Sequence, residues 1–105
     1  MKRVVMESPY AGNVEANVAY ARRALLDCLQ RGEAPIASHL LITQVLDDND
    51  PDQRAAGIAA GVAWHGVADL VVFYVDRGMT RGMHEAWNAA NAAGVPVVAR
   101  RIGHE

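Results

Sequence analysis

Hydrophobic and polar positions along the chain follow two different periods. Four short apolar runs predict strands, at residues 3–7, 34–38, 70–75 and 95–102. Three longer segments carry apolar side chains at three- and four-residue steps and predict helices, at residues 13–31, 50–65 and 80–94. The run at 70–75 is almost continuously apolar, which is typical of a strand covered on both faces. Residues 39–50 fit either a short helix or an apolar loop.

Polar residues mark where the three helices begin. Asn13, Asp50 and Thr80 stand just before the helical patterns, where a side-chain oxygen can accept hydrogen bonds from free backbone amides. Pro51 suits the first helical position, and Gln53 can close a capping box with Asp50. The segment 50–65 therefore has the clearest helix start in the chain.

The second helix is expected to carry glycines on a packed face. Its predicted inward residues are Ile58, Ala59, Val62 and Ala63. Gly57 and Gly61 each cost about 1 kcal/mol of helix propensity relative to alanine. Close packing against the sheet or another subunit would explain why both are present.

The order of elements predicts the architecture. Strands and helices alternate throughout, which favours a parallel sheet with helices on both faces in one α/β domain. We predict a doubly wound sheet of four to five strands in the order 2-1-3-4. In this order the first and third strands form the switch point, and the loops at residues 8–13 and 76–82 face each other across a crevice.

Composition narrows the class of protein. The chain has 105 residues with ten basic and twelve acidic side chains, a net charge of −2. This mixed balance argues against binding to a nucleic acid polymer or a membrane surface. Cys28 is the only cysteine, so an intrachain disulfide is excluded, and its place in an apolar stripe predicts a core residue. With neither a signal peptide nor a long apolar run, we expect a cytoplasmic protein.

The loop after the first strand is one candidate site. Ser8 and Tyr10 offer hydroxyl groups, and Gly12 with Asn13 opens a helix N-terminus that can hold an anion. A plain turn followed by a helix cap is the alternative reading. The position of this loop at the predicted crevice favours a role in binding.

Three carboxylates bracket the second candidate site. Asp69 begins the third strand and Asp76 follows it, and either one could instead be a turn former. Glu85 lies in the second turn of the last helix, where the helix dipole favours its ionised form by about 0.3–1 kcal/mol. An oriented carboxylate can attack an anomeric carbon. A surface Glu that complements the helix dipole is the alternative.

The four histidines show no metal-ligand spacing, so no metal site is predicted. His39 follows the second strand and is expected to reach the crevice.

Two blocks of the sequence resemble a known family. SPYAGNVEANVAYAR at residues 8–22 and ADLVVFYVDRGMTRGMHEAWNAANAAGVPVV at residues 68–98 look like the nucleoside 2-deoxyribosyltransferase superfamily, above all its small phage-associated branch. The likeness spans nearly the full chain, including PIASHLL at residues 35–41. It implies a flavodoxin-like fold over residues 1–105, a homodimer or larger homo-oligomer, and cleavage of a nucleoside or nucleotide N-glycosidic bond without a cofactor.

The resemblance also implies roles for individual residues. Glu85 would be the nucleophile, Asp69 and Asp76 would hold the base or assist proton transfer, and Tyr10 would orient Glu85 or contact the sugar. The 5′ end of the sugar would be cradled by Gly78, Thr80 and Gly82. The other expected ligand contacts are Met83, Ser8, Gly12, Asn13 and His39.

Two other classes of function stay open. A binding module could sequester a nucleotide or a nucleotide-derived signal in phage defence or counter-defence, without cleaving it. An assembly scaffold would use Gly57, Gly61 and Trp64 as an interface.

Overall fold

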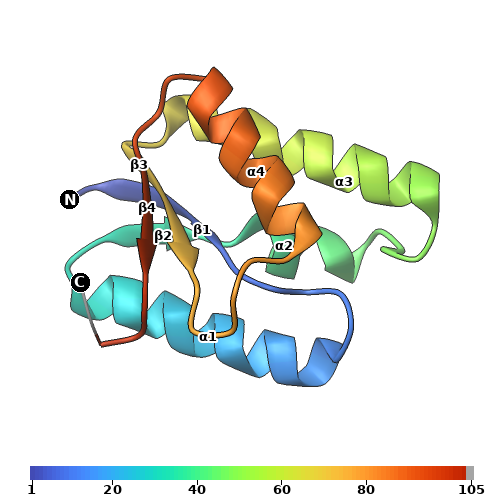
Figure 1. The fold of residues 1–105 in the computed structure, drawn as a ribbon, viewed down its shortest axis with the longest axis horizontal. Coiled ribbons are helices and arrows are strands. Elements are labelled where there is room, and N and C mark those ends of the chain that lie inside the picture. Colours follow the sequence, from blue (N-terminus) through green and yellow to red (C-terminus); the bar gives the residue numbers. More distant parts are fainter. Residues whose placement is uncertain (104–105) are drawn as a thin grey trace.

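Residues 1–103 are described in a computed structural model, and they follow the predicted alternation of strands and helices (Figure 1). The elements in chain order are β1 (Arg3–Glu7), α1 (Val14–Gln30), β2 (Ala34–Ile36), α2 (Ser38–Leu41), the 3₁₀ turn η1 (Ile42–Gln44), α3 (Pro51–Ala63), the 3₁₀ turn η2 (His65–Val67), β3 (Leu70–Tyr74), α4 (Arg81–Ala92) and β4 (Val97–Arg100).

The four strands run parallel in the order β2-β1-β3-β4, which confirms the predicted order. β1 pairs directly with β3, so that Val5 lies opposite Val71 and Glu7 lies opposite Phe73. The chain moves to one side of β1 to form β2 and to the other side to form β3. The carboxyl ends of β1 and β3 therefore form the switch point of a doubly wound, flavodoxin-like sheet.

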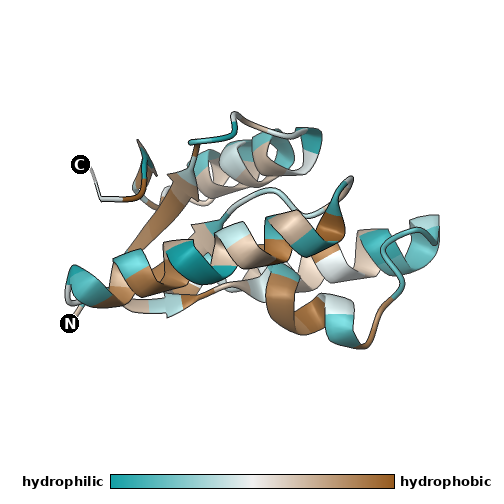
Figure 2. Cartoon of the chain, turned by 90° about the horizontal axis from the view of Figure 1, so that it is seen from below, coloured by the Kyte–Doolittle hydropathy of each residue, from teal (hydrophilic) through white to brown (hydrophobic). Residues whose placement is uncertain are grey.

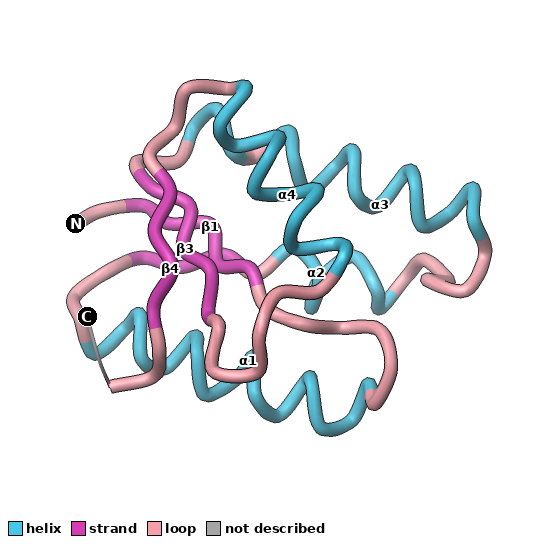
Figure 3. Tube along the Cα trace, in the orientation of Figure 1, coloured by secondary structure: helices cyan, strands magenta, loops and turns pink. Residues whose placement is uncertain are grey.

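Helices cover both faces of this sheet, with α1 on one side and α3 and α4 on the other (Figure 3). Cys28 of α1 packs with Val4 and Val72 in one buried cluster, as predicted for a core cysteine. Ala90 of α4 packs with Val71 in a second cluster. Successive strand residues point to opposite faces, so neighbouring valines supply both cores. The strands are accordingly largely brown in Figure 2.

The predicted helix caps are confirmed, but the capping box is not. Asn13 and Thr80 accept hydrogen bonds at the starts of α1 and α4. Asp50 accepts from the backbone amide of Gln53 at 3.3 Å. The Gln53 side chain instead accepts a hydrogen bond from the Asp47 amide at 2.7 Å, so it stabilises the preceding loop.

Some predicted boundaries were too generous. The strand expected at residues 34–38 ends at Ile36, because Ser38 already begins α2. The last strand covers Val97–Arg100 rather than residues 95–102, and α4 ends at Ala92. The segment 39–50 takes the helical alternative in its first part, as α2 and η1.

The inward face of α3 also differs from the prediction. Ala59 and Ala63 are exposed, whereas Gly61 is buried and Ile58 and Val62 are half-buried. The helix is therefore turned so that a glycine, not an alanine, faces the protein. None of the helices within residues 1–103 has both the length and the apolar character that a membrane span requires.

Candidate functional site

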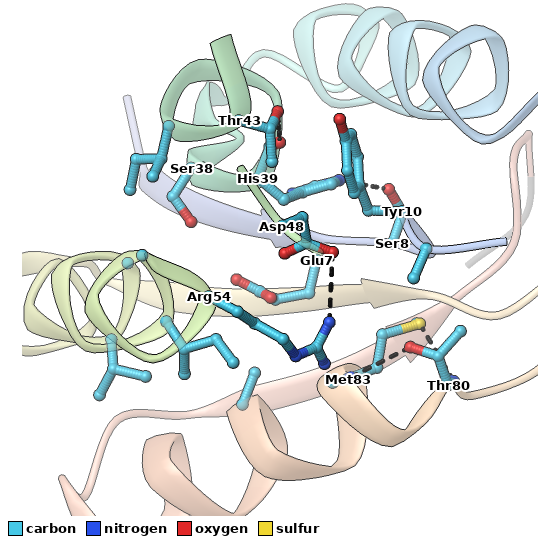
Figure 4. A pocket seen from close by; sticks show the side chains of 18 of the residues that line it. Glu7, Ser8, Tyr10, Ser38, His39, Thr43, Asp48, Arg54, Thr80 and Met83 are labelled. Atoms are coloured by element: carbon cyan, nitrogen blue, oxygen red, sulfur yellow. Dashed lines mark hydrogen bonds and ion pairs between the residues drawn. The ribbon is translucent and has the colours of Figure 1, made fainter. Parts of the chain in front are cut away.

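A pocket of about 220 Å³ opens beside the carboxyl end of β1 (Figure 4). Its walls come from the loop after β1, from α2 and η1, from α3 with η2, and from the first turns of α4. The polar and charged side chains among its lining residues are Glu7, Ser8, Tyr10, Ser38, His39, Thr43, Asp48, Gln53, Arg54, His65, Thr80 and Arg81.

Glu7 is the carboxylate at the end of the central strand. Its side chain is 14% exposed and lines the pocket. His65 from η2 is 1% exposed, and its Nε2 lies 3.8 Å from Oε1 of Glu7. The Glu7 carboxylate is thus partly withdrawn from water, with an imidazole beside it, and it forms part of the pocket wall.

Ser8 and His39 form a hydrogen-bonded pair next to Glu7. The Ser8 hydroxyl lies 2.8 Å from Nε2 of His39, and the dashed line in Figure 4 marks this contact. Burial lowers the pKa of His39, while the nearby Glu7 carboxylate raises it by less, so the imidazole is neutral at pH 7. The backbone carbonyl of His39 accepts a hydrogen bond from Thr43 at 2.6 Å, which fixes the end of α2.

Two ring nitrogens in this region have no hydrogen-bond partner. Within residues 1–103, the buried side-chain nitrogen and oxygen atoms without a partner are Nδ1 of His39 and Nδ1 of His65. Such atoms normally find partners, because leaving one unpaired costs about 1–3 kcal/mol. Both unpaired atoms belong to residues that line the same pocket.

Positive charge gathers on the opposite side of the pocket. Arg54 from α3 reaches toward the first turn of α4, where its guanidinium lies 3.6 Å from the position that a Cβ on Gly82 would take. Asp48 binds this guanidinium at 3.2 Å, as drawn in Figure 4. The N-terminus of α4 adds partial positive charge, with Thr80 as its cap. This side of the pocket therefore suits an anionic group.

The glycines of α3 set the width of the pocket. A Cβ on Gly61 would lie 2.7 Å from Oγ of Ser38, and one on Gly57 would lie 3.2 Å from Cγ2 of Ile42. The predicted close packing thus occurs against α2 and η1 rather than against the sheet.

Six of the predicted site residues line this pocket, and they are Ser8, Tyr10, His39, Thr80, Gly82 and Met83. Gly12, Asn13 and Gly78 do not. Gly12 and Gly78 hold positive φ angles of 101° and 81° in their turns, and Asn13 caps α1. Those three residues shape the loops around the site.

The two predicted aspartates also lie outside the pocket. Asp69 stands at the amino end of β3, the opposite end of the sheet from the pocket, and accepts a hydrogen bond from the Arg3 amide at 2.8 Å. Asp76 accepts a 2.6 Å hydrogen bond from the Tyr20 hydroxyl and a longer one from the Ile102 amide. Their oxygens therefore hold the chain together, and the predicted convergence with Tyr10 does not occur.

Glu85 does not face the pocket either. Its side chain is 44% exposed and lies 3.5 Å from Nε of Arg81. Met83 and Ala86 are the neighbouring residues of α4 that line the pocket. One residue along a helix turns the side chain by about 100°, so Glu85 lies on the flank of α4 beside this lining.

The charged and histidine side chains of the pocket that were missed from the sequence are Glu7, Asp48, Arg54, His65 and Arg81. Glu7 carried a usable signal, because it ends a central strand of a parallel sheet, and ligands bind outside the carboxyl ends of such strands. Arg54 lies one helical turn before Ile58 and His65 lies one turn after Val62, so both continue the stripe of two residues that were predicted to face inward. Within residues 1–103, no group of three His, Cys, Asp or Glu side chains is arranged to hold a metal ion.

The solved structures that share this fold include two whose likeness can be stated in numbers. One is a 2-deoxyribosyltransferase from Bacillus psychrosaccharolyticus, with a TM-score of 0.71 and 13% identity over 92% of this chain and 70% of that chain. The other is a CMP N-glycosidase from Clostridium botulinum, with a TM-score of 0.52 and 19% identity over 93% of this chain and 67% of that chain. At these identities the likeness concerns the fold. No curated protein matches the chain.

One family model matches residues 2–100, and its description is a domain of unknown function, DUF7768. The match runs from the start of β1 to the end of β4 and includes every residue that lines the pocket. The chain therefore belongs to the DUF7768 family.

Proposed function

We propose that the pocket binds a (deoxy)nucleoside or nucleotide and that the protein cleaves or transfers its N-glycosidic bond. The observation that carries this proposal is the partly buried carboxylate of Glu7 at the carboxyl end of the central strand. It lines a pocket in a fold shared with a 2-deoxyribosyltransferase and a CMP N-glycosidase. A carboxylate in this setting is suited to attack a sugar carbon.

The reaction would proceed in two halves. In the first, an oxygen of Glu7 attacks C1′, the bond from C1′ to the base nitrogen breaks, and its electron pair leaves with the base, which takes a proton from solvent. In the second, the resulting glycosyl ester passes its sugar to water or to another base, and Glu7 is released as a carboxylate. The two halves need only the side chain, the substrate, an acceptor and the exchange of a proton with solvent.

The 5′ end of the sugar would lie toward α4. Thr80 and Gly82 border the pocket at the helix N-terminus, and Arg54 adds a guanidinium that lies 3.2 Å from the Asp48 carboxylate. A 5′-phosphate would exchange with the Asp48 carboxylate on this guanidinium. This arrangement favours a nucleoside monophosphate over an unphosphorylated nucleoside.

Glu85 was the nucleophile predicted from sequence, and it remains a second candidate for that role. Its exposed carboxylate and its pairing with Arg81 make it less suited to the reaction than Glu7. The two assignments give opposite results when each carboxylate is replaced by its amide.

A nucleotide-binding module is the second candidate function. The position of Glu85 on the flank of α4 favours it, because the pocket then holds only the carboxylates of Glu7 and Asp48, and Asp48 is paired with Arg54. In this case Glu7 would accept hydrogen bonds from the ligand, and the base would stay attached.

One experiment separates the two functions. The purified protein is incubated with a panel of nucleosides and nucleoside monophosphates, free base is measured by chromatography, and thermal stability is recorded for the same mixtures. Catalysed release of free base supports the enzyme. A thermal shift without free base supports the binding module, and neither signal for any member of the panel contradicts both.

A further inference from the structure

The hydrogen-bonded pair Ser8 and His39 has a position that the two-step reaction leaves without a role. Ser8 follows Glu7 directly in the chain, its hydroxyl is 2.8 Å from Nε2 of His39, and both residues line the pocket with Glu7. Ser8 is 5% exposed, so bulk water is largely excluded from this hydrogen bond. A hydroxyl and an imidazole therefore meet beside the carboxylate.

The neutral state of His39 allows this hydrogen bond to run in either direction. Because burial keeps the ring neutral at pH 7, it carries one proton on either Nδ1 or Nε2. When the Ser8 hydroxyl donates to Nε2, that nitrogen acts as a base and the proton resides on Nδ1. This tautomer is the one in which a serine can pass its proton to the ring.

We propose that Ser8 and His39 take up the proton of the acceptor in the second half of the reaction, an inference that rests on the proposed function. As the oxygen of water attacks C1′ of the glycosyl ester, its proton moves to Oγ of Ser8 while the Ser8 proton moves to Nε2 of His39. The bond between C1′ and Glu7 breaks, and Glu7 leaves with the electron pair. His39 then returns its proton to solvent. When the sugar is transferred rather than hydrolysed, the N–H group of an incoming base takes the place of water and gives up its proton in the same way.

The charge on Glu7 makes this timing favourable. The Glu7 carboxylate raises the pKa of His39, against the larger lowering caused by burial. In the glycosyl ester Glu7 has no charge and no longer raises the pKa of His39. The unprotonated imidazole is therefore most favoured at the stage when His39 must act as a base. As Glu7 regains its charge, it stabilises the imidazolium that forms at the same moment.

The test separates the two halves of the reaction in the H39Q variant. The glutamine amide can still hydrogen-bond to Ser8 but cannot take up a proton. We expect a burst of about one free base per protein, followed by turnover slowed about 10²–10⁴-fold. Intact-mass spectrometry is expected to detect protein carrying one sugar. The exposed His84 on α4 provides the control, because H84Q should match the wild type in burst and turnover.

Several results would overturn the inference while leaving the proposed function in place. Wild-type turnover in H39Q would show that His39 has no role in the reaction. A folded H39Q protein that gives no burst would show that His39 acts in binding or in the first half of the reaction. The S8A variant gives a second test, since its hydroxyl link is gone and it should also accumulate the sugar-bound protein. Wild-type protein that releases no base at all would instead overturn the proposed function itself.

Discussion

Two carboxylates compete for the role of nucleophile, and their surroundings differ. Glu7 is 14% exposed, lines the pocket and has the buried His65 beside it. Glu85 is 44% exposed and shares its charge with Arg81, itself almost fully exposed. Electrostatic interactions are stronger where water is excluded. A change in the charge of Glu7 therefore affects the surrounding groups more strongly than a change in the charge of Glu85. At the residue scale the structure therefore favours Glu7.

A prediction at the same scale concerns His39 and acid. Because burial lowers the pKa of this imidazole in the folded state, the unfolded chain takes up a proton first as the pH falls below its ordinary value of about 6.5. The free energy of unfolding should thus decrease as the pH drops below about 6.5. Urea denaturation at a series of pH values should show a flatter decrease for H39Q than for the wild type.

The control for this measurement is the exposed His84. The H84Q variant should keep the wild-type decrease. Equal pH dependence in H39Q and the wild type would mean that His39 is not held neutral by the fold.

At the scale of elements, the pocket depends on how closely α3 approaches α2. Gly61 leaves room for Ser38, whose Oγ would lie 2.7 Å and whose Cβ would lie 3.3 Å from an added methyl group. The two elements form adjacent walls of the pocket. Any side chain at position 61 would therefore widen the gap between them.

We predict that G61A destabilises the protein despite the better helix propensity of alanine. Rotation of the Ser38 side chain relieves the contact with Oγ but not the contact with Cβ, so overpacking should exceed the gain in propensity by about 1 kcal/mol. Urea denaturation measures the difference. The double variant S38A/G61A should recover part of the loss, and a G61A protein more stable than the wild type would contradict the close approach.

The same elements show what the sequence can predict. Asn13, Asp50 and Thr80 cap their helices as expected, because a helix start depends on a few adjacent residues. The inward face of α3 was wrong, because alanine and glycine differ little in hydrophobicity and the face is chosen by close packing with Ser38 and Ile42. That packing joins residues from separate segments, which periodicity does not reveal.

At the scale of the whole molecule, the order of strands creates the site. The predicted order 2-1-3-4 is observed, and it leaves the carboxyl end of β1 open between the layers. The crevice between the two loops was predicted, but its third wall from α2 and α3 was not. As a result Ser8, Tyr10 and His39 were found from sequence, while Arg54 and His65 were not.

Ligand binding to this pocket should stabilise the whole fold. At a concentration of one hundred times its Kd, a ligand that binds the folded state alone raises the free energy of unfolding by about 2.7 kcal/mol. At equal concentration we predict a larger thermal shift for a nucleoside monophosphate than for the matching nucleoside, because Arg54 and the start of α4 favour an anion.

The R54Q variant tests the source of that preference. The thermal shift of R54Q with the monophosphate should fall to the thermal shift with the nucleoside. The control is R22Q, which changes an exposed residue of α1 and should behave as the wild type. An unchanged preference in R54Q would exclude Arg54 from phosphate binding.

The release of free base by the wild type, E7Q and E85Q, compared by chromatography with the same nucleotide, tests the central claim most directly. Both substitutions keep the size of the side chain and remove its charge. The account predicts that E85Q releases base at nearly the wild-type rate and that folded E7Q releases none above the uncatalysed background. Loss of activity in E85Q, with activity retained in E7Q, would contradict it.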